Sequence, residues 1–143
     1  LENRFRGSEE EIRKRLEIYP SYFLRAEKPV LEIGSGRGEL QKLFAEAGIL
    51  SYGVDLDQAM VERAREAGAK VEYADGLRHL TTLPEKSLGG IIAVQVVEHL
   101  SRDQLLTLFS LAAETVKTGG RIIFETINPR SLLALSSNYF RDP

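Results

Sequence analysis

The amino-acid sequence predicts an α/β fold in which a doubly wound, mostly parallel sheet carries helices on both faces. Short apolar runs alternate with stretches of helical periodicity along the chain, which is the pattern of stacked βαβ units. A glycine-rich stretch follows the first apolar run of this series and opens the next helical stretch. Because crossovers between parallel strands are right-handed, these units place their strands in one sheet.

The composition limits the classes of function. With 143 residues, 43% of them hydrophobic, residues 1–143 are expected to form one domain around one core. The net charge of −2 provides no basic field for phosphates, so nucleic acid is not an expected partner. The absence of cysteine excludes disulfides, thiolate metal ligands and a cysteine nucleophile, and we expect no metal site. We expect a cytoplasmic protein without a membrane span, because the apolar runs are short and the start lacks a signal-peptide core.

The first half of the chain predicts a leader helix region, residues 1–28, and then two strand–helix units. Ser8 and Glu11 have the spacing of a capping box, which marks the start of a helix. Strands are expected over residues 30–33 and 50–54, each followed by a helix, and Gly68 ends the second of these helices. Apolar residues of the leader recur at helical spacing on one face: Ile12, Leu16, Tyr19 and Phe23.

The second half predicts three more strands, over residues 70–74, 91–97 and 121–127. The tract between the first two, which contains Pro84 and the pair Gly89-Gly90, is expected to be a loop. Ser101 and Gln104 predict a second capping box, and Gly119-Gly120 is expected to end that helix. A last helix is expected over 129–138. The inner face of the capped helix is expected to contain Leu105, Leu108, Phe109, Ala112 and Val116.

The strongest functional signal lies in residues 30–40, where a strand enters a turn that contains Gly34, Gly36 and Gly38. Glycines let a backbone turn sharply and approach a ligand, and the following helix offers free N–H groups at its start. Such glycines can also serve the turn alone. A dinucleotide fingerprint requires glycine where this chain has Glu39, so the spacing argues against NAD.

Two carboxylates follow the next two predicted strands. Asp55 ends the second strand about 20 residues after the glycine turn begins, which is the position from which a carboxylate holds ribose hydroxyls. Asp75, next to Gly76, follows the third strand, where it can accept a hydrogen bond from an adenine amino group. The sequence therefore predicts a nucleoside site without a phosphate seat.

These motifs resemble the class I S-adenosylmethionine-dependent methyltransferases, in particular their small-molecule members, over residues 30–127. The matching tracts are 32–38, 53–56, 74–76, 94–100 and 117–124. The resemblance implies a Rossmann-like sheet in the order 3-2-1-4-5, S-adenosyl-L-methionine as cofactor and S-adenosyl-L-homocysteine as product. The full family ends its sheet with an antiparallel hairpin that this sequence lacks, so we expect a C-terminal truncation.

The resemblance also assigns roles to single residues. It places the glycine turn at the methionine part of the cofactor, Asp55 at the ribose, Leu56 on the adenine and Asp75 at the base. The backbone of Gln95 is expected to hold the cofactor amino group. Glu32 is expected to order the turn, although it can also be a buried acid bound only by backbone N–H groups. The cofactor-binding residues expected in this core are Glu32, Gly34, Ser35, Gly36, Gly38, Asp55, Leu56, Asp75, Gly76, Leu77 and Gln95.

The leader segment resembles leader helices of methyltransferases linked to polysaccharide and lipopolysaccharide synthesis, and residues 128–131 and 138–143 of the tail resemble the same subgroup. In such enzymes a leader arginine meets the cofactor carboxylate in a charge-assisted hydrogen bond, and Arg15 matches it here. Alternatively, Arg15 lies on the solvent face of its helix. This resemblance predicts oxygen methylation of a sugar, a glycan or another small-molecule acceptor.

Methyl transfer from a sulfonium depends chiefly on the positioning of donor and acceptor, so no nucleophilic side chain is needed. A hydroxyl acceptor benefits from a general base, and Glu98 and His99 are the candidate catalytic residues. Both can instead be polar residues at a strand end without a catalytic role. An alternative function is a cofactor-binding fragment or regulatory remnant without turnover of its own. Apolar surface at the fifth-strand edge favours a homodimer.

Overall fold

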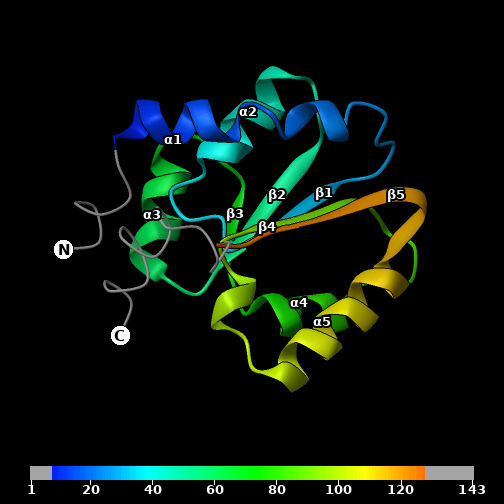
Figure 1. The fold of residues 1–143 in the computed structure, drawn as a ribbon. Coiled ribbons are helices and arrows are strands. Elements are labelled where there is room, and N and C mark those ends of the chain that lie inside the picture. The colour runs from blue at the N-terminus through cyan, green and yellow to red at the C-terminus, as the bar shows by residue number, and fades with distance from the viewer. Residues whose placement is uncertain (1–7, 128–143) are drawn as a thin grey trace.

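A computed structural model of the chain describes residues 8–127 and contains a five-stranded parallel sheet in the order β3-β2-β1-β4-β5 (Figure 1). This confirms the predicted fold class and strand order. The strands are β1 (Val30–Ile33), β2 (Ser51–Asp55), β3 (Val71–Tyr73), β4 (Leu88–Val94) and β5 (Val116–Glu125). The α-helices are α1 (Glu9–Leu16), α2 (Glu39–Glu46), α3 (Gln58–Glu66), α4 (Gly76–Thr81) and α5 (Arg102–Thr115), and two short 3₁₀ turns are η2 (Pro20–Tyr22) and η3 (Val97–His99).

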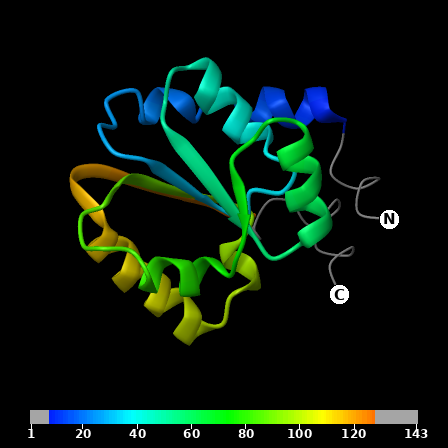
Figure 2. The same cartoon turned by 180° about the vertical axis from the view of Figure 1, so that it is seen from behind.

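Helices cover both faces of the sheet, with α1 and α2 on one side and α4 and α5 on the other (Figures 1 and 2). Successive residues of a strand point to opposite faces, so each strand contributes to two cores. Leu31 and Ile91 pack with Leu108 of α5, whereas Val30 packs with Phe44 of α2. The α3 helix packs on β3 in a smaller cluster. This layering brings the carboxyl ends of all five strands to one edge of the sheet.

Both predicted capping boxes are present, at Ser8 with Glu11 and at Ser101 with Gln104. The leader helix is shorter than its apolar spacing predicts, because α1 ends at Leu16. Pro20 begins η2, and a proline ring is incompatible with the interior of an α-helix. Tyr19 and Phe23 are nevertheless buried against α2 and the sheet.

The fourth strand lies three residues earlier than predicted, since β4 begins at Leu88 and ends at Val94. The glycine pair that predicted a loop lies inside β4, where the leader segment crosses it. A Cβ at Gly90 would lie 2.5 Å from Cε1 of Phe23, and the N–H of Gly89 donates to the carbonyl of Pro29 at 2.8 Å. The two glycines therefore make room for the leader. The strand ends before Gln95, which has a left-handed φ of 55°.

The boundary between α5 and β5 also differs from the prediction. The helix ends at Thr115 and β5 begins at Val116, so Gly119-Gly120 lies within β5 at an irregularity in its pairing with β4. Phe109 is not on the inner face of α5: it is 46% exposed and its ring lies 5.6 Å from that of Phe124, centroid to centroid. The sequence also missed α4, where it predicted only a loop.

The remaining strand boundaries are close to those expected. Leu50 is exposed and precedes β2, and β3 is one residue shorter at each end than the predicted 70–74. The predicted helix over 129–138, the tail over 128–143 and the first seven residues lie outside the described residues.

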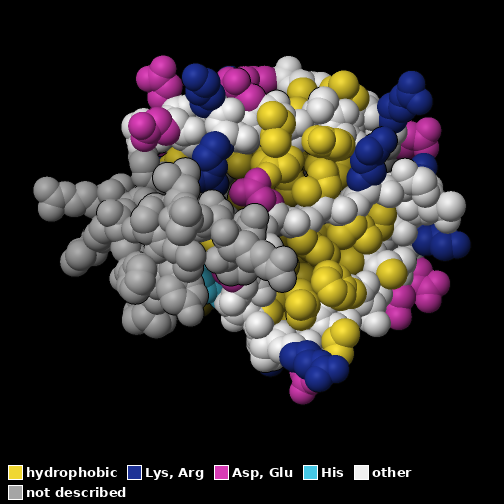
Figure 3. Space-filling view, viewed as in Figure 1, with side chains coloured by type: hydrophobic (Ala, Val, Ile, Leu, Met, Phe, Trp, Pro, Cys, Tyr) yellow, Lys and Arg dark blue, Asp and Glu magenta, His cyan; other side chains and the backbone are white. Residues whose placement is uncertain are grey.

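Hydrophobic side chains gather over the middle of the face viewed in Figure 3, between the two helical layers, where β5 forms the edge of the sheet (Figures 1 and 3). The large apolar residues exposed on β5 and α5 are Ile122, Leu106 and Phe109. The homodimer expected at this edge remains a prediction. In the range 8–127, no helix combines the length and the apolar character that crossing a membrane requires.

Candidate functional site

A cavity of about 190 Å³ lies at the carboxyl edge of the sheet, where ligands commonly bind in open α/β folds. Its lining includes Gly34 from the glycine turn, Asp55 at the end of β2 and Asp75 after β3. The two carboxylates that the sequence singled out therefore face one cavity rather than two. Six expected cofactor-binding residues line it: Gly34, Asp55, Leu56, Asp75, Gly76 and Leu77.

The glycine turn is hydrogen-bonded to the end of β2 and packs closely against its neighbours. Gly34 and Ser35 both donate their N–H groups to the carbonyl of Val54, at 2.9 and 3.2 Å. Gly34 has a φ of +73°, and a Cβ there would lie 2.5 Å from Cγ2 of Val96. Gly38, with a φ of +80°, is the N-cap of α2 and lies against Ala69. A side chain at either position would therefore strain the backbone and displace a packed neighbour.

Asp55 connects β2 to the glycine turn and to the start of α3. Its Oδ2 accepts the N–H of Gly36 at 2.7 Å and its Oδ1 accepts the N–H of Asp57 at 2.8 Å. Each carboxylate oxygen has two lone pairs, so both oxygens keep acceptor capacity for a ligand hydroxyl. Leu56, the next residue, is 61% exposed and lines the cavity, where its side chain can contact a flat ligand surface.

Asp75 lies at the cavity because it is the N-cap of α4, and its Oδ1 accepts the N–H of Arg78 at 2.8 Å. An aspartate at this position satisfies one of the donors that the helix start leaves unpaired. Gly76 and Leu77 form the first turn of α4 and complete this wall. The sequence predicted the aspartate but not the helix that holds it.

Residues from beyond β4 close the opposite wall of the cavity, and the sequence did not predict them. They are Val96, Leu100, Gln104 and Leu108. Gln104 is the capping-box residue of α5, whose Oε1 accepts the N–H of Ser101 at 2.9 Å. Its capping pattern was recognisable in the sequence, but its position beside β1 and β3 depends on long-range packing.

Glu32 and Ser35 lie in the interior, outside the lining of the cavity. The carboxylate of Glu32 is buried and accepts a hydrogen bond from Nε2 of Gln41 at 2.7 Å, while Oε1 of Gln41 accepts one from the Ser51 hydroxyl at 2.7 Å. This chain of contacts connects β1, α2 and β2 under the glycine turn. Ser35 is 4% exposed and packs against Gly53, and its hydroxyl has no hydrogen-bond partner within residues 8–127.

Arg37 and Glu39 form a second polar feature of the turn, which the sequence did not identify. Nε of Arg37 lies 2.8 Å from Oε1 of Glu39, and both side chains are largely buried. Glu39 is in the first turn of α2, where the helix dipole favours a negative charge. The acid that argued against a dinucleotide is thus part of an ion pair that closes the turn onto α2.

The other predicted site residues meet at the ends of β4 and β5. The N–H of Gln95 donates to the carbonyl of Glu125 at 2.8 Å, and the Thr126 hydroxyl donates to Oε2 of Glu98 at 3.0 Å. Arg15 is largely exposed, with NH2 3.8 Å from Oε1 of Glu125. His99 is exposed at the end of η3. Gln95, Glu98, His99 and Arg15 are not among the residues that line the 190 Å³ cavity.

A larger hollow, of about 420 Å³, lies between residues 21–27 and 117–121, near the start of β5. An ion pair crosses it from Nζ of Lys117 to Oε2 of Glu27, at 2.7 Å, and lowers the pKa of that carboxyl. It is remote from the strand ends where the predicted site residues gather. In the described part of the chain, no group of three or more His, Cys, Asp or Glu side chains is placed to hold a metal ion.

Comparison with known sequences gives matches over the region that contains the cavity. A protein family described as a methyltransferase domain matches residues 31–124. An uncharacterized methyltransferase of Geobacillus sp. (strain WCH70) is 32% identical over 101 residues, covering 70% of this chain and 47% of that protein. A ubiquinone biosynthesis O-methyltransferase of Saccharophagus degradans is 33% identical over 113 residues, covering 72% and 45%. The chain therefore spans about half the length of these curated relatives.

Comparison of structures agrees with the sequence matches. The crystal structure of a SAM dependent methyltransferase from Archaeoglobus fulgidus is similar, with a TM-score of 0.90 and 39% sequence identity. The similarity covers 97% of this chain and 62% of that one. All residues that line the carboxyl-edge cavity fall within the range 31–124.

Proposed function

This chain belongs to the methyltransferase domain family, and we propose that it binds S-adenosyl-L-methionine at the carboxyl edge of its sheet and methylates a small-molecule acceptor. One observation carries the proposal: Asp55, Asp75 and the bare backbone of Gly34 line a single cavity. This is the arrangement that a nucleoside with an amino-acid arm requires, because ribose, base and arm each meet a different strand end.

The residues present fit such a cofactor. In this proposal Asp55 accepts the ribose hydroxyls through lone pairs that its two backbone donors leave available. Leu56 covers one face of the adenine, and Asp75 accepts the hydrogen bond of the adenine amino group. Glu32 has an indirect role in this proposal: its hydrogen bond with Gln41 joins β1 to α2 on either side of the glycine turn. Gly36, Gly38 and Ser35 shape the turn.

The contribution of the protein to the reaction is chiefly orientation. When bound, the sulfonium of the cofactor supplies an activated methyl group, and an acceptor must approach it in line. We propose that the acceptor approaches at the ends of β4 and β5, where Gln95, Glu98 and Arg15 meet Glu125 and Thr126. Glu98 or His99 would accept the proton of a hydroxyl acceptor there.

We propose a sugar or another hydroxyl-bearing small molecule as the acceptor. The resemblance of the leader segment to methyltransferases of polysaccharide and lipopolysaccharide synthesis supports a sugar. The relative named for ubiquinone biosynthesis O-methylation supports oxygen as the acceptor atom. A hydroxyl acceptor also suits the local chemistry, since Glu98 lies in a hydrogen bond with Thr126 beside β5.

Two measurements test the proposal. Calorimetry with S-adenosyl-L-homocysteine should detect binding to the purified chain, and titration with NADH should not. Incubation with radiolabelled S-adenosyl-L-methionine and candidate glycans or phenols should then label a small molecule. Labelling of protein or nucleic acid alone would contradict the proposed acceptor class.

Substitution at the candidate bases tests the catalytic step. Glu98→Gln and His99→Asn should leave product affinity within about threefold, and the variant that removes the true base should lower turnover about 100-fold or more. If neither variant loses turnover, neither residue is the base. If the chain binds the cofactor but does not turn over, and a version extended as in its longer relatives does, the chain alone is a binding module.

A further inference from the structure

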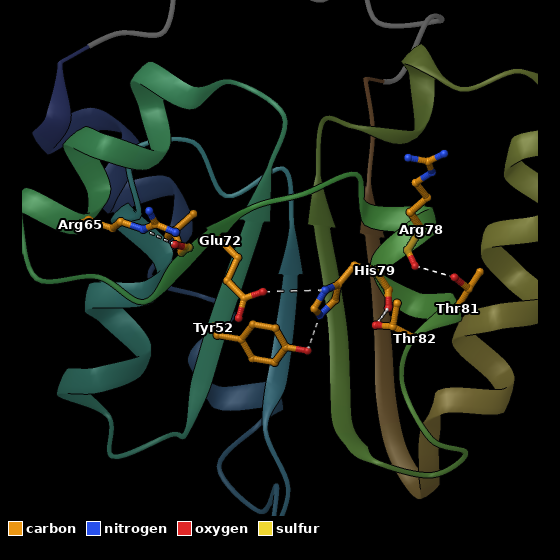
Figure 4. Close-up of polar contacts among 8 residues, drawn as sticks. Tyr52, Arg65, Glu72, Arg78, His79, Thr81 and Thr82 are labelled. Atoms are coloured by element: carbon orange, nitrogen blue, oxygen red, sulfur yellow. Dashed lines mark hydrogen bonds and ion pairs between the residues drawn. The ribbon is translucent and has the colours of Figure 1, made fainter.

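A partly buried polar cluster lies near the carboxyl-edge cavity, on the face of the sheet that α4 covers. The hydroxyl of Tyr52, from β2, lies 2.8 Å from Nε2 of His79, from α4. Oε2 of Glu72, from β3, lies 4.0 Å from Nδ1 of the same imidazole. Figure 4 shows Tyr52 and Glu72 pointing toward His79 from neighbouring strands. None of these three residues lines the cavity.

The chemistry of the cluster favours one direction for the hydrogen bond between Tyr52 and His79. Burial, together with the charge of Glu72, raises the pKa of Tyr52 to about 12, so the phenol keeps its proton. A phenol O–H donates to Nε2 when the imidazole proton is on Nδ1, and a carboxylate beside Nδ1 favours that tautomer. In this arrangement Tyr52 donates to His79, and Glu72 lies beside Nδ1 of the imidazole.

This contact joins the two elements that carry the aspartates of the cavity. Tyr52 precedes Asp55 by three residues on β2, and His79 follows Asp75 by one helical turn on α4. The N–H of His79 donates to the carbonyl of Asp75 at 2.8 Å. The α4 helix has only six residues, and so short a helix depends on tertiary contacts for its position. In the part of the chain that the structure describes, side chains of β2 and α4 hydrogen-bond to each other at Tyr52 and His79.

We propose that Tyr52 and His79 are positioning residues that hold Asp75 at a fixed distance from Asp55 and thereby determine selectivity for the exocyclic amino group of the bound purine. The inference rests on the proposed function, since it assigns the base to Asp75. Asp75 accepts hydrogen bonds and, when ionised, donates none. An adenosyl ligand presents an amino donor to it, whereas an inosyl ligand presents a carbonyl oxygen that the carboxylate repels. That discrimination depends on how tightly Asp75 is held.

The experiment compares S-adenosyl-L-homocysteine with its inosyl analogue by calorimetry on the intact chain. The wild-type chain should prefer the adenosyl form by about tenfold or more, which corresponds to one charge-assisted hydrogen bond. Tyr52→Phe and His79→Leu should lose most of this preference, chiefly through weaker adenosyl binding. His79→Gln should keep it, because a glutamine carbonyl can accept the Tyr52 hydrogen in place of Nε2.

Tyr22→Phe is the matched control, since it removes a phenol hydroxyl from the leader segment, which lines the other hollow. Thermal unfolding of each variant separates a loss of selectivity from a loss of fold, and a purely structural role would weaken both ligands equally. Retained selectivity in folded Tyr52→Phe and His79→Leu would overturn the positioning role while leaving the proposed function intact. Absence of binding by the wild-type chain to either ligand would overturn both.

Discussion

The ends of β1, β2 and β3 differ from the ends of β4 and β5 in what holds their polar side chains. Asp55 accepts the backbone N–H groups of Gly36 and Asp57, and Asp75 accepts that of Arg78. Both aspartates line the cavity. Glu98 and Arg15 contact β5 and its following residue instead, at positions outside the cavity lining. The first group lines a preformed pocket, and the second lies outside its lining.

The largest expected effect is at Asp55. An Asp55→Asn variant keeps the shape but replaces one acceptor by an amide donor, which must face the N–H of Gly36 or of Asp57. We expect the affinity for S-adenosyl-L-homocysteine to fall by about 100-fold, together with a lower midpoint of thermal unfolding. Calorimetry on this variant and on Glu98→Gln tests the comparison directly. Equal losses in the two variants would show that the two groups do not differ.

The next largest effect is expected at Gly34, which follows β1 and lies against Val96, two residues after the end of β4. A Gly34→Ala variant combines a strained positive φ with the contact to Val96, and should lose about 2–4 kcal/mol of unfolding free energy. Gly48→Ala is a matched control, because Gly48 has nearly the same φ and no atom within 4 Å, so it should lose only about 1 kcal/mol. Denaturant unfolding measures both.

A double variant, Gly34→Ala with Val96→Ala, should recover part of the loss, since it removes the methyl group that the new Cβ would meet. If Gly34→Ala and Gly48→Ala cost the same, then the close packing of the glycine turn against η3 contributes nothing. In that case the two halves of the sheet are not coupled through this contact.

The smallest effect is expected away from both groups, at the contact between α1 and α2. NH1 of Arg13 donates to Oε1 of Glu46 at 3.0 Å, and this partner lowers the pKa of Glu46 from its ordinary 4.5. A lowered folded-state pKa adds stability above pH 4.5, and that stability is lost as the pH falls through the folded pKa. Glu46→Gln should therefore lower the unfolding midpoint slightly at neutral pH and not at strongly acidic pH.

Salt provides the check on this last prediction, because 1 M salt screens exposed charges, with a Debye length of about 3 Å. The difference between wild type and Glu46→Gln should then disappear at neutral pH. Glu66→Gln serves as a control, since Glu66 has no ion-pair partner among residues 8–127. A loss in Glu46→Gln that persists at acidic pH would mean that Glu46 acts through packing rather than charge.

The sequence predicted best those features whose cause is local. The capping boxes at Ser8 and Ser101 depend on residues three apart, and the strand, the glycine turn and the start of the next helix lie within eleven residues. Asp55 and Asp75 were found because strand ends of a parallel sheet share an edge. The sheet order followed from the resemblance and was confirmed.

The features it missed depend on distant parts of the chain. Gly89 and Gly90 have the composition of a loop, yet they lie within β4 because the leader segment passes over them. The α4 helix is too short to show periodicity, and its contacts lie on β2 and α5. Likewise, Val96 and Leu108 reach the cavity only through packing of η3 and α5. No pattern of neighbouring residues in the sequence indicates such contacts.

The two backbone N–H groups on Asp55 have a consequence for ligand exchange. They hold the carboxylate in one rotamer and compensate its charge before any sugar arrives, so association does not have to freeze that side chain. If a nucleoside binds as proposed, its departure leaves a carboxylate that still accepts two backbone N–H groups. Under the proposed function, the entropic cost of ordering this side chain is therefore met once, during folding, and not at each binding event.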